Sequence, residues 1–133
     1  MMLMYPGPKP EAGAMPTKVQ IDAMMKYNEE LSSAGILLAL DGLQPTSKGA
    51  RIRYQGGKPT VTDGPFTESK EILGGYWMIQ VKSRDEAIAW ASKCPASDEE
   101  MIEIRQVYEM ADFPAESISE ETARRAEEIS SKL

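Results

Sequence analysis

The order in which strand-like and helix-like patterns follow one another is the feature that most constrains the fold of this chain. A short apolar run precedes a helical repeat and a second apolar run. The same strand–helix–strand order returns after two alternating runs that flank a glycine pair. Each helix in such an order has to bury its apolar stripe against the sheet that the strands form. The 133 residues are enough for one domain with one core.

Most of the predicted elements have a start or stop signal beside them. The first helix is expected between Pro16 and Gly35, and the second begins at a capping box in which Glu86 follows Ser83 by three positions. Prolines at positions 6, 8 and 10 end the first strand. We expect strands over residues 1–5, 36–43, 75–81 and 101–110, a hairpin over 50–64, helices over 17–35 and 83–95, and a further helix from Ser117.

This order of elements matches a split βαβ arrangement, in which an antiparallel sheet carries two helices on one face. We therefore predict the α+β class, with a ferredoxin-like βαββαβ domain over residues 1–112 that contains an inserted β-hairpin. Residues 113–133 are expected to form a C-terminal helical tail, because their apolar positions make only a weak line.

The sheet face away from the helices would be bare in a monomer. Apolar and aromatic side chains of the predicted strands predict that this face is buried against a second copy, in a homodimer of the dimeric α/β barrel type. Tyr76 and Trp77 must point to opposite faces of their strand. One of them is expected in the core, and the other at the dimer interface or in a pocket wall.

Composition excludes several classes of function. The chain contains no histidine, so the commonest zinc ligand and the Ser–His and Cys–His nucleophilic systems are missing, and its one cysteine is Cys94. We expect no cofactor and no metal. A net charge of −6 argues against nucleic-acid binding. The longest apolar run, residues 36–40, is too short for a membrane span, and no secretory leader pattern is visible, so a cytoplasmic location is predicted.

The stretch "VTDGPFTESKE" from Val61 supplies two candidate site residues. Asp63 could act as a general base whose pKa is raised at a strand end, or it could support an Asx turn at a corner set by Gly64 and Pro65. Lys70 could bind an anion or keep Asp63 ionised, or it could belong to a solvated charged surface.

A second group of candidates comes from the neighbouring strands. Asp41 closes an apolar strand, where an acid lies either at the sheet rim or buried with a partner, and it is the other catalytic candidate. Arg51 and Arg53 share one face of the predicted hairpin and could pair with Asp41 or with a ligand carboxylate. Trp77 is the candidate for an aromatic ligand contact.

Several spaced motifs together resemble a known family. "LSSAGILLALDGLQP", "VTDGPFTESKE", "GGYW", "AIAWASKCP" and "IEIRQVYE" occur in the order seen in DGPF proteins, a branch of the YCII-related family, and the resemblance covers residues 1–110. It implies a dimeric ferredoxin-like domain. One branch of that family has a histidine in the first helix and an aspartate just after the second. This chain has Met24 and Cys94 near those places, so the dyad's chemistry is not transferred.

Two main functions remain open at this point. The first is binding of a small polar or anionic molecule in a cleft at one sheet end, extending to metal-independent acid–base catalysis by Asp41 and Asp63. The alternative is a regulatory interaction module. The resemblance implies association with sigma-factor proteins, and the acidic C-terminal helix suits a protein partner. A domain whose only property is dimerisation is a third option.

Overall fold

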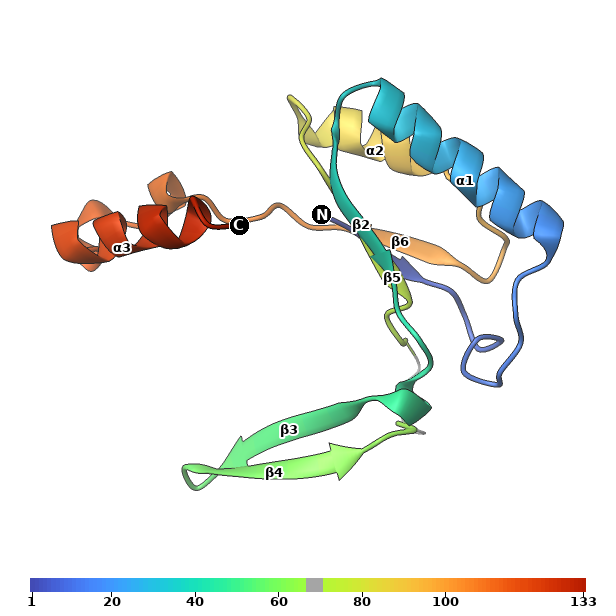
Figure 1. The fold of residues 1–133 in the computed structure, drawn as a ribbon, viewed down its shortest axis with the longest axis horizontal. Helices are drawn as coiled ribbons and strands as arrows, with labels where there is room; N and C mark the ends of the chain where they lie inside the picture. Colours follow the sequence, from blue (N-terminus) through green and yellow to red (C-terminus); the bar gives the residue numbers. More distant parts are fainter. Residues whose placement is uncertain (67–70) are drawn as a thin grey trace.

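The computed structural model describes residues 1–66 and 71–133, and within them the chain is α+β, with antiparallel sheets and three α-helices (Figure 1). Lys70, one of the predicted ligand residues, lies outside the described residues. The strands are β1 (Met2–Tyr5), β2 (Leu37–Gly42), β3 (Ala50–Gln55), β4 (Lys58–Asp63), β5 (Gly75–Ile79) and β6 (Met101–Ile104). The α-helices are α1 (Lys18–Ser33), α2 (Arg84–Ser92) and α3 (Glu120–Ser130).

The main sheet has the strand order β2-β5-β1-β6, and every neighbouring pair is antiparallel. Helices α1 and α2 lie on the same side of it (Figure 1). This order is compatible with a ferredoxin-like fold, because each helix connects two strands that have another strand between them. The strands β3 and β4 form a separate two-stranded antiparallel sheet that follows β2 and precedes β5.

The two body helices, α1 and α2, lie within the predicted ranges; the Ser83 cap was predicted, and the Thr17 cap was not. Thr17 caps α1 in a capping box with Gln20, whose backbone N–H donates to the Thr17 hydroxyl at 3.2 Å. The Ser83 hydroxyl accepts the Glu86 backbone N–H at 3.1 Å and begins α2. Gly35 follows α1 with a φ of 73°, a left-handed conformation that glycine adopts without strain.

Two predicted boundaries are wrong. The last strand ends at Ile104 instead of residue 110, because its neighbour β1 pairs with it only as far as Met2, opposite Ile104. The tail helix begins after Ser119, whose hydroxyl accepts the Thr122 N–H at 3.1 Å, and not at Ser117. The chain before Ser119 forms a short 3-10 helix over Ala115–Ser117, so Ser117 is the last residue of that helix and Ser119 is the cap of α3.

The core lies between the main sheet and the two body helices. Trp77 packs edge-on against Tyr27, with ring centroids 5.8 Å apart, and its Nε1 donates to the Asn28 Oδ1 at 2.8 Å. The Tyr27 hydroxyl donates to the Trp90 carbonyl at 2.7 Å and so joins α1 to α2. Buried hydrophobic residues among those described are Met2, Met4, Tyr27, Leu31, Trp77 and Ala87.

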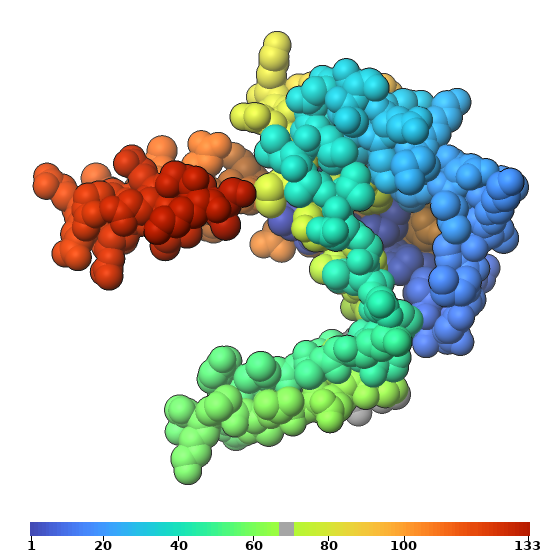
Figure 2. Space-filling model, viewed as in Figure 1, coloured from blue at the N-terminus to red at the C-terminus, as the bar shows by residue number. Residues whose placement is uncertain are grey.

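Two parts of the chain extend away from this body. The hairpin β3–β4 and the segment that ends in α3 both project on the side of the main sheet opposite α1 and α2 (Figure 1). The space-filling view shows a recess bounded by the sheet, the hairpin and this C-terminal segment (Figure 2). We call the face of the main sheet opposite α1 and α2 its open face, because within residues 1–66 and 71–133 no helix packs on it.

Candidate functional site

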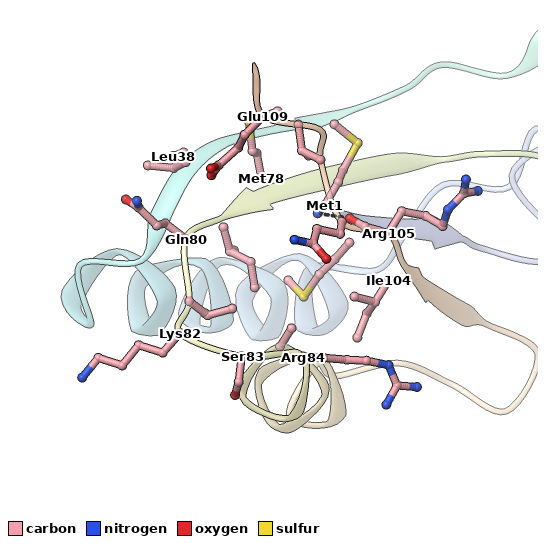
Figure 3. Close-up of a pocket in the computed structure, with 16 residues that line it drawn as sticks. Met1, Leu38, Met78, Gln80, Lys82, Ser83, Arg84, Ile104, Arg105 and Glu109 are labelled. Atoms are coloured by element: carbon pink, nitrogen blue, oxygen red, sulfur yellow. Dashed lines mark hydrogen bonds between the residues drawn. The ribbon is translucent and has the colours of Figure 1, made fainter. Parts of the chain in front are cut away.

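The larger cavity lies at the end of the main sheet where β5 leads into α2 (Figure 3). Its volume is about 540 Å³, which is within the usual range for small-molecule sites. Its wall is formed where the sheet, α2 and the segment after β6 meet, and just over half of the lining residues are apolar. The apolar lining includes Met2, Met78, Ile79, Ala87, Ile104 and Val107.

The polar lining of this cavity contains three cationic residues besides Gln80, Ser83, Gln106 and Glu109. Lys82, Arg84 and Arg105 belong to the lining, and in Figure 3 their charged ends lie at the periphery, around the apolar side chains. The arrangement therefore offers an apolar interior and a basic rim, which suits a molecule with an apolar body and an anionic group.

The loop before α2 is held in place by its helix cap. The Glu86 carboxylate accepts the Lys82 backbone N–H at 2.9 Å, and the Ser83 hydroxyl accepts the Glu86 N–H. On the opposite wall the Met1 amino nitrogen donates to the Arg105 carbonyl at 2.7 Å, and burial lowers the pKa of this amino group. These contacts fix the backbone on two sides of the cavity.

Asp41 lies on the open face of the main sheet, near the end that leads to the hairpin. The register places it beside Tyr76, whose hydroxyl donates to the Asp41 Oδ2 at 2.8 Å. This hydrogen bond and the negative charge of Asp41 raise the pKa of Tyr76. The same register continues through Leu3 to Glu103, which pairs with Arg105 at 3.5 Å. Asp41 thus has a partner that sequence reasoning did not propose.

Asp63 is exposed at the last position of β4. An Asx turn here would need the N–H of the residue two positions on, but that residue is Pro65, which has none. The next N–H, that of Phe66, donates to the Thr46 hydroxyl at 3.1 Å. The corner is therefore supported by Thr46, and Asp63 does not support it in the way predicted.

A carboxylate from the first loop holds Thr46. The two oxygens of Glu11 accept the Thr46 backbone N–H and its hydroxyl, each at 2.6 Å. These two hydrogen bonds lower the pKa of Glu11. Gly64 packs so closely on Thr46 that a Cβ built on it would lie 1.6 Å from the Thr46 carbonyl oxygen. We call these three residues the Glu11–Thr46–Gly64 clamp.

The predicted basic residues that the structure describes, Arg51 and Arg53, both lie on β3. The Arg51 guanidinium carbon lies 3.9 Å from the centroid of the Phe66 ring, at the base of the hairpin. Arg53 is exposed further along β3. Trp77 is 6% exposed and belongs to the core, so its side chain lines neither cavity. Tyr76, the neighbour of Trp77 on β5, is the aromatic residue on the open face of the sheet.

A second cavity of about 440 Å³ lies at the opposite end of the main sheet. Its lining is strongly acidic and includes Glu11, Glu71, Asp98, Glu99 and Glu100. Within residues 1–66 and 71–133, no group of three or more such side chains is arranged to hold a metal ion. In the same part of the chain no helix is both long and apolar enough to cross a membrane.

Sequence reasoning missed the residues of the larger cavity: Gln80, Lys82, Arg84, Arg105 and Glu109. A signal for them was present, because the Ser83 cap marks a strand-to-helix junction that ends in basic residues. The stretch "VTDGPFTESKE" has more charged residues close together and was the stronger signal. Of its described residues, Asp63 ends β4 at the base of the hairpin.

Comparisons with known proteins show which family this chain is similar to. The model of the YCII-related domain matches residues 1–111. A curated relative, an uncharacterized protein of Rhizobium meliloti (strain 1021), is 43% identical over 58 residues, which is 44% of this chain. The match spans 47% of that relative's own length.

Proposed function

This chain belongs to the YCII-related domain family, and we propose that it binds a small amphipathic anion in the cavity at the β5–α2 end of its sheet. The observation that carries the proposal is the combination of an apolar wall with a rim of Lys82, Arg84 and Arg105. An apolar body would fill the interior, and a carboxylate or sulfonate would reach the rim. The sequence predicts a small polar or anionic ligand, and the proposal restricts it to anions that have an apolar body.

Acid–base catalysis in this cavity would rest on few groups. Among the lining residues the structure describes, Glu109 is the one carboxylic acid. The predicted catalytic pair, Asp41 and Asp63, lies toward the hairpin end, so a reaction that used them would need a different ligand position. The proposed function is therefore ligand binding, with Glu109 as the candidate for proton transfer.

The test uses a fluorescent probe of the proposed chemistry, 8-anilinonaphthalene-1-sulfonate, in competition with decanoate and with decanol. Decanoate should displace the probe at lower concentration than decanol, because only decanoate carries a charge for the basic rim. Lys82→Gln combined with Arg84→Gln should lower the affinity for decanoate about tenfold or more and leave the affinity for decanol unchanged. The matched control, Lys18→Gln with Lys26→Gln, removes the same charge from exposed positions on α1. Equal effects of the two double variants would refute a specific rim.

The partner that we propose for the body of the chain is a second copy of itself, in contact through the open face of the main sheet. Support comes from the apolar residues that this face presents, among them Leu3 and Met78. Leu3→Asp should then convert a dimer to a monomer in sedimentation experiments, because an aspartate at a buried interface loses its hydration.

A second candidate function is the regulatory interaction module that the family resemblance implies. The observation that favours a protein partner is α3, where Ile129 is 63% exposed. Removal of residues 113–133 should then abolish a complex with a purified sigma-factor domain and leave probe binding in the cavity intact. Probe binding without any such complex would favour the first function.

A further inference from the structure

We propose that the β3–β4 hairpin is a dimerisation arm, which packs its apolar face on the open sheet face of a second copy of this chain. Its basic side chains would then face the acidic segment of that copy, which we define as residues 109–121. This inference rests on the homodimer proposed above and specifies how the two copies hold each other.

The hairpin has one apolar and one polar face. The register places Ile52 opposite Val61, and Tyr54 opposite Pro59, on the same side of the two strands. Ile52 is 57% exposed, Val61 63% and Tyr54 77%. A two-stranded hairpin alone is marginally stable in water, so a hairpin with an uncovered apolar face needs another surface to pack on.

The hairpin is held away from its own sheet. At its base the Glu11–Thr46–Gly64 clamp joins the first loop to the end of β4. The hairpin projects from the body on the open-face side, where it borders the recess and not the core (Figure 2). A surface that can cover the hairpin's apolar face is therefore more readily supplied by another molecule than by the chain itself.

The exposed area of the chain supports a second copy as that molecule. A compact monomer of 14.7 kDa exposes about 6,900 Å². This chain exposes 10637 Å², an excess of about 3,700 Å² over that size scaling. Obligate dimers bury about 2,000 to 5,000 Å² in total. Two extended copies therefore carry enough surplus surface for an interface of that kind.

The charges of the two projecting parts are complementary. The hairpin carries Arg53 and Lys58 on its polar face, in a chain whose net charge is −6. The acidic segment carries Glu109, Asp112, Glu116, Glu120 and Glu121. In a two-fold dimer each contact between unlike patches occurs twice, so a basic arm and an acidic segment on the same chain are self-complementary.

The first experiment is sedimentation equilibrium with two matched double variants. Ile52→Asn with Val61→Asn disrupts the apolar face of the hairpin, whereas Thr60→Asn with Thr62→Asn changes two positions on the other face. The first pair should raise the dimer dissociation constant by at least about a hundredfold, and the second pair should leave it nearly unchanged. Equal dissociation constants for the two pairs would overturn the proposal.

The second experiment exchanges charge between the arm and the acidic segment. Arg53→Glu with Lys58→Glu, or Glu116→Lys with Glu120→Lys, should each weaken the homodimer. All four changes in one chain keep the net charge at −6 and should restore the homodimer. A mixture of the two double variants should form heterodimers. If neither rescue occurs, the acidic segment is not the contact of the arm.

Hydrogen exchange separates this inference from the proposed homodimer. Amides of β3 and β4 should be protected at concentrations where the chain is dimeric, and should lose protection on dilution. Protection that does not depend on concentration would mean that the hairpin packs on its own chain, and would overturn the arm. Suppose that Leu3→Asp disrupts the dimer but Ile52→Asn with Val61→Asn does not. This result would support the proposed homodimer and exclude the hairpin as its dimerisation arm. A wild-type chain that is monomeric at all concentrations would refute both.

Discussion

Replacement of Trp77 by phenylalanine tests which face of β5 forms the core. The Trp77 side chain is 6% exposed, and its Nε1 donates to Asn28 at 2.8 Å. Loss of this hydrogen bond removes about 1 kcal/mol. The smaller ring leaves about 40 Å³ unfilled, which at about 24 cal/mol per Å³ removes about 1 kcal/mol more. Trp77→Phe should therefore lower the free energy of unfolding by about 2 kcal/mol.

The adjacent residue provides a matched control on the opposite face. Tyr76→Phe also removes one side-chain hydrogen bond, the one to Asp41, but at a solvent-accessible position. Its effect on the free energy of unfolding should be much smaller. Both variants are unfolded in urea and followed by far-UV circular dichroism at one protein concentration, because dimerisation makes stability depend on concentration. If Trp77→Phe is no more destabilising than Tyr76→Phe, the placement of Trp77 in the core is wrong.

Three further predictions concern the clamp and the cysteine. Gly64→Ala should loosen the hairpin base, because the new Cβ would lie 1.6 Å from the Thr46 carbonyl oxygen. Amide exchange in the hairpin measures this effect. Gly42→Ala is the control, because a Cβ at that position has no atom within 4 Å. The lowered pKa of Glu11 means that its contribution is present above about pH 4.5 and is lost as pH falls through its folded-state pKa. Acid should therefore loosen the hairpin in wild type but have less effect in Glu11→Gln, in the same exchange assay. Burial raises the pKa of Cys94 from 9.0 to about 11, so at pH 8 iodoacetamide should alkylate it about a hundredfold more slowly than in urea; equal rates would contradict its burial.

Local signals in the sequence were sufficient for much of the fold. Thr17 and Ser83 cap their helices because a serine or threonine hydroxyl bonds an N–H only three positions away. Tyr76 and Trp77 face opposite sides because side chains alternate along any strand. The tail helix was located less well, since Ser117 and Ser119 are both suitable caps and short-range preference does not choose between them.

Contacts between residues far apart in the sequence set the partners of Asp41 and Glu11. The partner of Asp41 follows from the register of β2 against β5, which sets Tyr76 beside it across 35 positions of sequence. Glu11 and Thr46 are also 35 positions apart, and nothing in either local sequence indicates that they pair.

Short-range patterns were enough to predict the order of strands and helices, the starts of α1 and α2, and the opposite orientation of Tyr76 and Trp77, because each depends on residues a few positions apart. The position of the larger cavity at the β5–α2 end, away from Asp63, and the exposure of the hairpin's apolar face became visible only in the folded chain. The cavity and the projecting hairpin both depend on where strand pairing in the main sheet ends and on how the loops pack. Those properties arise from long-range contacts, which no short window of sequence encodes.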